Sequence, residues 1–334
     1  MNPSPVSGGL RIGLIAALLV MPPAPFCYQS SAADLPIIGT TELFNETTTI
    51  GTGDTLTLTA SVAGTAAKVY VGSGADESGE LVLTADGLIQ LTSSTANSGL
   101  IIGNDGGTGL LSMSGGTINL LSDPGHYNTF YIGLGNGSGG TFNQSAGTVS
   151  INGSAFGVGV VSGTGVYTLS GTAEVIAAAG SSIFIGSDKA ADSANGGDGT
   201  VNISDSARFI IGTEATPSSQ IFVGGDTDDV GTGRFVQNGA SSEVSLITTN
   251  RDHFGYSNGG IATYTLNDGS LTMGSAQGVA FGEGTGSSGT LTQNGGSFST
   301  TGGKLWIGLA GSGTFTLNGG TASIGTGGLM LAQS

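Results

Sequence analysis

Residues that could act on a sugar chain occur at two places in the sequence. Hydrolysis of a glycosidic bond needs two carboxylates that flank it, and elimination needs a basic residue beside carboxylates that bind Ca²⁺. The candidates are Asp226, Asp228 and Asp229 in "GGDTDDVGTG", and Arg251, Asp252 and His253 in "RDHFG". A solvated loop is the simpler explanation of the first group, and a surface strand that of the second. We therefore assign no catalytic residue and keep a polysaccharide lyase or hydrolase as an alternative.

Metal-binding motifs are incomplete in this chain. The stretch "GGDGTVNIS" departs from the repeat of calcium-binding β-rolls, because Val201 stands where that repeat has an aspartate. The acidic run from Asp226 misses the spacing of an EF-hand loop, because Val230 holds its fifth position. His126 lies in the polar stretch "LSDPGHYN", as is typical of an exposed residue. The sequence predicts no metal site and no cofactor.

A row of aromatic residues is the candidate partner-binding site. A short motif, apolar–any–apolar–glycine, recurs through the chain, and several of its copies carry an aromatic residue in the middle: Tyr70, Tyr131, Phe184, Phe222 and Trp306. If the flanking apolar residues face inward along a strand, the middle residue faces outward. An exposed row of this kind could stack on sugar rings or contact another protein. The alternative is that corner loops cover the row, or that both faces of the strand are buried.

The same motif marks a repeat that must position these residues. Its last residue recurs at intervals of 24 to 38 residues. These anchor positions are Gly72, Gly103, Gly133, Gly159, Gly186, Gly224, Gly255, Gly282, Gly308 and Ala332. The extra residues of the longer intervals fall in polar stretches such as "SDKAADSANGGDG", which can bulge outward as loops.

Each repeat contains three short bursts of alternating apolar residues, as in "LWIG", "TFTLN" and "TASI". Alternation with period two, bounded by glycine, is typical of half-buried strands. Such short strands cannot bury an apolar face alone, so equivalent strands must stack on one another. The sequence therefore predicts an all-β fold, a parallel β-helix (a pectin-lyase-like solenoid) of about ten coils with three short strands per coil. A propeller is disfavoured, because a ring of this many units exceeds the usual number of blades.

Two sets of polar residues interrupt the apolar pattern. One occupies the position before the middle turn of each coil: Ser114, Ser145, Ser170, Ser204, Asn238, Asn267, Asn294 and Asn318. We expect these side chains to bond to the turn backbone and to form amide ladders between coils. The other set, Gln144, Gln237 and Gln293, replaces apolar residues in one strand position, which predicts either a solvent-reachable corner or paired amides.

The composition and charge of the chain restrict the classes of function and partner that it could have. Residues 1–33 combine Arg11, a short apolar run and a small-residue cleavage region, which is typical of a secretory signal peptide. The only cysteine, Cys27, lies in this leader, so neither disulfides nor thiolate metal sites are expected in the mature chain. The full chain has a net charge of −16, and removal of Arg11 makes it more negative. Scattered basic residues in an acidic chain exclude nucleic acid as a partner.

The unit "IGLAGSGTFTLNGGTASIG" and its relatives resemble the repeats of type V secretion (autotransporter) passengers and of PEP-CTERM-sorted proteins of Gram-negative bacteria, over roughly residues 69–332. The resemblance implies an exported β-helical passenger, displayed at the cell surface by a C-terminal barrel or a sorting tail outside this chain. We divide the chain into a signal peptide (1–33), an N-terminal coil or cap (34–68) and β-helix repeats (69–334), and we expect further sequence after Ser334.

The leading functional hypothesis is a non-catalytic exported passenger at the cell surface or outer membrane, acting as a stalk or adhesive scaffold. The partners expected of it are glycans or the surface of a host or neighbouring cell. The alternatives are the carbohydrate-active enzyme and a self-associating extracellular matrix protein with lateral contacts between copies.

Overall fold

The computed structural model describes residues 35–37, 48–58, 61–65, 68–85, 87–93, 99–122, 128–187, 195–226, 229–257 and 259–331. The predicted signal peptide lies outside these residues, as do His126 and Asp228. Within the described residues every element is a β-strand, and none is a helix of the length and apolarity needed to cross a membrane.

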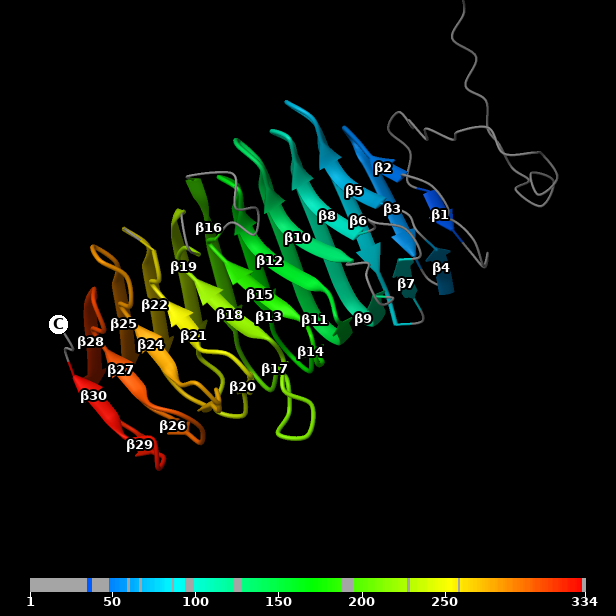
Figure 1. The fold of residues 1–334 in the computed structure, drawn as a ribbon. Coiled ribbons are helices and arrows are strands. Elements are labelled where there is room, and N and C mark those ends of the chain that lie inside the picture. Colours follow the sequence, from blue (N-terminus) through cyan, green and yellow to red (C-terminus); the bar gives the residue numbers. More distant parts are fainter. Residues whose placement is uncertain are drawn as a thin grey trace, which may run out of the picture.

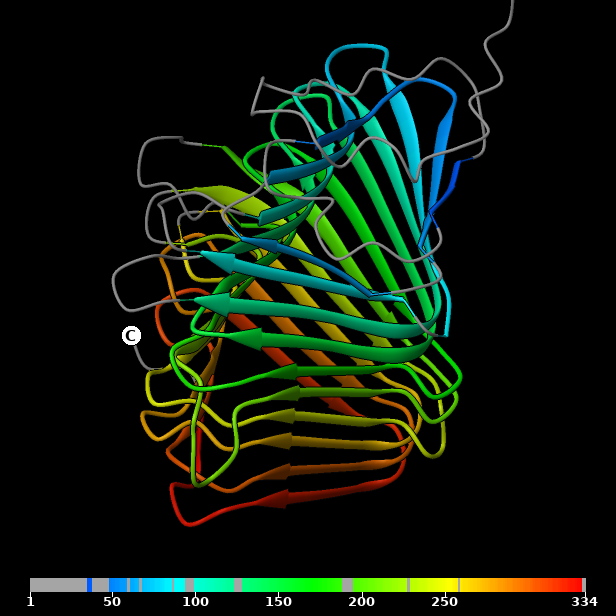
Figure 2. The ribbon, with the colours of Figure 1, turned by 90° about the vertical axis from the view of Figure 1, so that its right-hand side faces the viewer.

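The chain folds into a parallel β-helix, and this confirms the predicted fold class. Strands of successive coils lie side by side from β2 at the blue end to β30 at the red end (Figure 1). Figure 2 shows the same stack from the side, with equivalent strands forming rows along it. Every pairing between named strands is parallel, as between β10 and β12 and between β22 and β25.

Each coil contributes one strand to each of three ladders. The anchor ladder carries the repeated motif and consists of β2 (Thr48–Ile50), β5 (Lys68–Ser73), β8 (Gly99–Asn104), β10 (Thr129–Leu134), β12 (Ala155–Val160), β15 (Ser182–Ile185), β18 (Gln220–Val223), β21 (Asp252–Phe254), β24 (Val279–Phe281), β27 (Leu305–Ile307) and β30 (Leu329–Leu331). The first coil, β2 to β4, pairs in register with the second, so the coil stack begins before residue 69.

The second ladder follows the anchor glycine. It consists of β3 (Asp54–Leu58), β6 (Ser78–Leu83), the first parts of β9 (Thr108–Ser122) and β11 (Gly139–Asn152), then β13 (Thr164–Leu169), β16 (Asn195–Ile203), β19 (Val230–Gln237), β22 (Ile261–Leu266), β25 (Ser288–Gln293) and β28 (Ser312–Leu317). The short strand β1 (Leu35–Ile37) pairs with β3 in this ladder.

The third ladder completes each coil. It consists of β4 (Ser61–Thr65), β7 (Leu88–Ser93), the last parts of β9 and β11, then β14 (Glu174–Ala177), β17 (Arg208–Ile211), β20 (Glu243–Leu246), β23 (Ser270–Met273), β26 (Ser297–Thr300) and β29 (Thr321–Ile324). In two coils the second and third strands are one continuous strand, β9 or β11, in place of the separate strands that we predicted. The pairing of these two strands shifts register around Ala146, where the middle turn occurs.

A continuous interior row of apolar side chains runs through the anchor ladder. Its members face one another coil by coil in the order Val71, Ile102, Ile132, Val158, Ile185, Val223, Phe254, Phe281 and Ile307. All of them are buried in one hydrophobic core, as predicted from the repeat. Burial of each such side chain stabilises the fold by roughly 1.5–3 kcal/mol, and a single coil would leave these side chains exposed.

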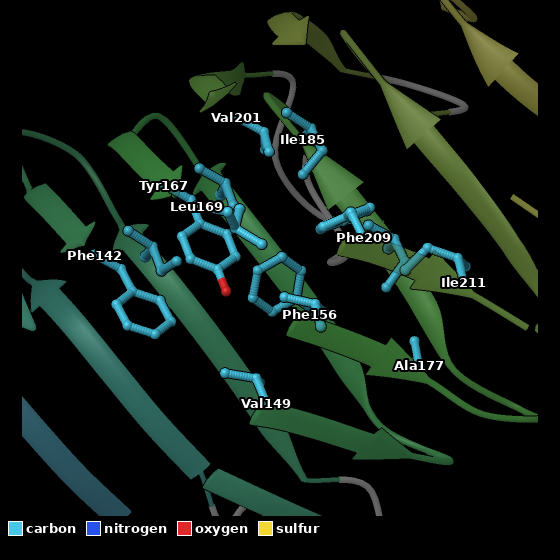
Figure 3. Close-up of a cluster of buried hydrophobic side chains, with 14 of the residues drawn as sticks. Phe142, Val149, Phe156, Tyr167, Leu169, Ala177, Ile185, Val201, Phe209 and Ile211 are labelled. Carbon is cyan, nitrogen blue, oxygen red and sulfur yellow. The ribbon is translucent and has the colours of Figure 1, made fainter. Parts of the chain in front are cut away.

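Aromatic rings fill the middle of this core. The ring of Phe142 stacks on that of Tyr167 in the next coil, with centroids 4.5 Å apart and planes 5° from parallel. Phe156 lies against Phe209 and Tyr167 (Figure 3). The three strand ladders therefore share one interior, which leaves only their outer faces and corners for contact with other molecules.

The three glutamines are buried in the core. Tyr167 donates a hydrogen bond to Gln144 Oε1, and Tyr264 donates one to Gln237 Oε1 at 2.7 Å. The amide nitrogens donate to turn carbonyls, as Gln144 does to Gly147 at 2.8 Å. Both expectations for these residues are therefore wrong, because the glutamines are buried and their amides bond to tyrosine and serine hydroxyls and to backbone carbonyls instead of to one another.

Gln293 lacks the tyrosine that its two counterparts have. Phe315 occupies the equivalent position, two residues before the partner of Gln293 in the next coil, and Gln293 Oε1 is buried without a hydrogen bond. We expect Phe315→Tyr to raise the free energy of unfolding by about 1–2 kcal/mol, because its hydroxyl would satisfy this acceptor. Urea unfolding of the two proteins measures the gain. Phe209→Tyr is the control, since Phe209 of β17 is fully buried several coils away from Gln293, so the added hydroxyl should destabilise. Equal effects of both changes would refute the pairing.

The predicted amide ladder is also present. Asn267, Asn294 and Asn318 each donate through Nδ2 to Oδ1 of the asparagine one coil earlier, at 2.7, 2.7 and 2.8 Å, beginning at Asn238. Of the serines earlier in the series, Ser145 and Ser170 donate to the backbone carbonyls of Met113 and Gln144, and Ser204 donates to the Asp205 carboxylate. The ladder ties four coils together along one exposed corner.

Candidate functional site

The predicted aromatic residues lie in one outer row on the anchor ladder. Pairing between strands sets Tyr131 opposite Gly157, Phe184 opposite Phe222, and Trp306 opposite Ala280. The part of the outer row that holds the five predicted aromatic residues is Tyr70, Ile101, Tyr131, Gly157, Phe184, Phe222, His253, Ala280 and Trp306, and the register continues it to Thr49 and Met330. It faces away from the main core and forms a separate hydrophobic cluster over much of its length.

The expectation that this row is exposed is wrong for its central members. Tyr131, Phe184 and Phe222 are 9%, 4% and 5% exposed, and only the end members Tyr70 and Trp306 are partly exposed. The covered row, which we had as the alternative, is therefore the arrangement found. Binding of a partner by these residues remains a prediction, and it would need the covering residues to move.

Corner residues after the anchor strands cover the outer row. Val160, Val161 and Tyr256 pack against it. The row has no side chain at Gly157, and a Cβ there would come within 2.8 Å of both Tyr131 and Val160, so these two neighbours fill the space. Val161 has φ of 54°, which is an unfavourable conformation for a β-branched residue. The covering corner is thus held in place by packing at a cost in backbone strain.

Charged residues gather at the C-terminal part of the outer row. His253 of β21 stacks on Phe222 with ring centroids 4.7 Å apart, and its Nδ1 lies 2.6 Å from Glu283 Oε2. Arg251 donates through Nη1 to Glu283 Oε1 and lies over the Trp306 ring, 4.5 Å from its centroid. Glu283 follows the anchor glycine of the next coil. We call Arg251, His253 and Glu283 the charged cluster.

The charges of the charged cluster stabilise the ionised form of Glu283. Burial raises the pKa of Glu283, but hydrogen bonds and electrostatic attraction from His253 and Arg251 outweigh it and hold this pKa below its usual value. The Glu283 side chain is only 10% exposed and both of its oxygens are bonded. The carboxylate is therefore ionised and already neutralised by its neighbours.

The residues of "RDHFG" divide between the two faces of β21. Asp252 points into the core, opposite to Arg251 and His253, where its Oδ1 accepts from the Thr248 hydroxyl at 2.8 Å and from the Ile221 amide at 3.3 Å. Its Oδ2 is buried without a partner. Burial raises the pKa of Asp252 to about 8, although these two hydrogen bonds act in the opposite direction.

The charged cluster contains some of the side chains that general acid–base catalysis needs. An imidazole oriented by a carboxylate can act as a general base, and His253 with Glu283 has this arrangement. A second carboxylate on the same face is missing among the described residues, because Asp252 faces the core. Asp229 accepts through Oδ1 from the Asp226 amide within its own corner and is 2% exposed. The described part of the chain also holds no group of three or more metal-ligating side chains.

A shallow hollow of about 200 Å³ lies over β9, β11 and β13. Hydroxyl and amide side chains form most of its lining, which consists of Val82, Ser112, Met113, Ser114, Asn143, Gln144, Ser145, Thr168 and Ser170. It holds no charged residue and is smaller than most ligand sites. Nothing in this hollow could act as a general acid or base.

The chain was compared with protein families, with curated proteins and with solved structures. None of the three comparisons gives a match. The resemblance of the repeats to autotransporter passengers and PEP-CTERM-sorted proteins therefore stays a prediction.

Proposed function

We propose that this protein is a non-catalytic scaffold of the bacterial cell surface, exported through its leader and serving as a stalk or an adhesive support. The observation that supports this proposal best is the unbroken interior row from Val71 to Ile307. Coils stacked about 4.8 Å apart form a rod roughly 45–50 Å long. A rod with one shared core resists bending and presents its corners at a fixed distance from its attachment.

The chemistry of the surface agrees with this role. The net charge of −16 keeps copies apart in solution. Within the charged cluster, the ion pair between Arg251 and Glu283 joins two successive coils. The leader and the resemblance of the repeats to exported passengers add the route by which such a rod would reach the surface of a Gram-negative cell.

Labelling of intact cells tests this proposal. Antibodies raised against the purified chain should label the source bacterium without permeabilisation, and external protease should remove the label. A cytoplasmic protein serves as the control for cell integrity. Labelling that appears only after permeabilisation would contradict surface display.

A carbohydrate-active enzyme is the second candidate, and the charged cluster is the observation in its favour. The full chain would be assayed for release of reducing ends and of unsaturated sugars from a panel of neutral and acidic polysaccharides. Activity that falls at least 100-fold in Glu283→Gln, with unfolding still cooperative, would support the enzyme. Activity that persists in this variant would place any chemistry elsewhere.

A further inference from the structure

Hydroxyl and amide side chains cover the outer face of three successive coils near the C-terminal end of the described chain. They occupy equivalent outward positions in β22 and β23, in β25 and β26, and in β28 and β29. We call this set the hydroxyl face; it consists of Thr263, Thr265, Asn267, Ser270 and Thr272, then Thr290, Thr292, Asn294, Ser297 and Ser299, then Thr314, Thr316, Asn318, Thr321 and Ser323.

Stacking of the coils does not require these residues on the second ladder. The residue type varies at the equivalent outward positions of earlier coils, which hold Thr55, Glu80, Leu110, Thr141, Val166, Thr200 and Arg234. The uniform composition of the hydroxyl face is therefore a property of its surface.

The threonine hydroxyls of this face are free to bind. The amides are bonded to one another along the corner, and Thr272 lies 3.1 Å from Ser299. By contrast, none of the six threonines of the second ladder makes a side-chain hydrogen bond to a described residue: Thr263, Thr265, Thr290, Thr292, Thr314 and Thr316. Their hydroxyls and methyls repeat about every 4.8 Å along the rod and about every 6.7 Å across it.

Most classes of partner do not suit this surface. It has no cation for nucleic acid or an acidic glycan, and it lacks the aromatic and arginine anchors of protein interfaces. Two carboxylates border it: Asp268 accepts from the Gly269 amide, and Glu243, opposite Ser270, pairs with Arg208. Hydroxyls alone are poor metal ligands.

We propose that the hydroxyl face binds a neutral linear polysaccharide whose chain lies along the rod axis. Threonine offers a hydroxyl that donates and accepts, and a methyl that packs on the apolar face of a sugar ring. Because the rows repeat coil by coil, they match a polymer in which the same hydroxyls recur from one sugar to the next. The acidic chain repels acidic glycans, so selection is for uncharged ones. This inference rests on the proposed function and gives its adhesive role a site.

Binding of the full chain to insoluble cellulose and chitin and to soluble neutral glucans tests the inference, with polygalacturonate and alginate as acidic comparisons. The triple variant Thr265→Val, Thr292→Val and Thr316→Val keeps the β-branched shape and removes one row of hydroxyls. We expect at least one neutral polysaccharide to bind, and its affinity to fall 10-fold or more in the triple variant. Thr200→Val, an outward position of β16 between Val166 and Arg234, is the matched control and should bind as the parent does.

Several results would overturn the inference. They are failure of every neutral polysaccharide to bind, equal binding of the acidic ones, or undiminished binding by the triple variant with its unfolding midpoint unchanged. Inhibition of ice recrystallisation that the triple variant loses, without polysaccharide binding, would assign the face to ordered water instead. Surface labelling of intact cells is independent of all these assays, so failure here leaves the scaffold proposal standing.

Discussion

Asp252→Asn is expected to make the protein more stable above pH 8 and to remove most of a pH dependence between about pH 4 and 8. The carboxyl of Asp252 has a pKa of about 8 in the fold and an ordinary value of 3.8 when exposed. In this range the unfolded chain ionises at Asp252 while the folded chain keeps the proton. The free energy of unfolding therefore falls by up to about 1.4 kcal/mol per pH unit and levels off above pH 8. Asparagine keeps the shape of the protonated acid and cannot ionise.

Urea unfolding at pH values from 4 to 9 measures this effect. The parent and Asp252→Asn should have similar midpoints near pH 4 and differ by several kcal/mol at pH 9. The lowered pKa of Glu283 acts in the opposite sense, but its stabilisation is lost only as the pH falls below the ordinary value of 4.5, which is the acid edge of this range. Asp76→Asn removes an exposed carboxylate and should leave the slope unchanged. Parallel profiles of the parent and Asp252→Asn would contradict a protonated Asp252.

Gly133→Ala is expected to cost roughly 3 kcal/mol or more in the free energy of unfolding. The anchor glycine has φ of 76°, and a Cβ there would lie 2.0 Å from the backbone oxygen of Thr164 in the next coil. Backbone atoms cannot rotate away as a side chain can, so the two coils would have to separate locally. The loss therefore includes both the strain of a positive φ and the hydrogen bonds at this corner.

Gly137→Ala provides the matched control in the same corner. Gly137 has φ of 74°, but the nearest atom to its Cβ would be 3.8 Å away. Only the conformational cost applies there, about 1–2 kcal/mol. Thermal and urea unfolding of the two variants separates the terms. Equal losses would mean that close approach between coils does not determine where glycine is needed.

The sequence predicted the architecture well because each coil repeats the same short pattern of residues. Alternating apolar residues before a glycine defined the strands, and the spacing of anchors such as Gly133 and Gly159 defined which residues would meet. The interior row followed directly from that alignment. The same reasoning found the asparagine ladder, because identical side chains at one position of successive coils must become neighbours.

The covering of the outer row was harder to predict. Alternation correctly placed Tyr131, Phe184 and Phe222 opposite the core, but it carries no information on what packs over them. The signal was present in the corners, where Val160 and Val161 form an apolar pair and Tyr256 follows an anchor glycine. Most other corners are polar. The apolar residues at these corners have no packing partner within their own repeat, and this indicates that they pack on another part of the molecule.

The charged cluster shows a second limit. Arg251, Asp252 and His253 are adjacent in sequence, yet alternation along β21 sends Asp252 to the core. The carboxylate that joins Arg251 and His253 is Glu283, contributed by the next coil. Sequence proximity therefore suggested the wrong acid, and only the pairing of β21 with β24 identified the right one. The partner of Gln144, a tyrosine in the next coil, was missed for the same reason.

The register between coils also makes the length of the molecule easy to change. Ile261 lies opposite Ser288, and Thr272 contacts Ser299, 27 residues later. If one such unit were duplicated or lost, each remaining coil would still stack on an equivalent coil. Mutation could therefore lengthen or shorten the rod by whole coils while the same core packing is kept. For the surface scaffold that we propose, the length of the rod could then evolve separately from its fold.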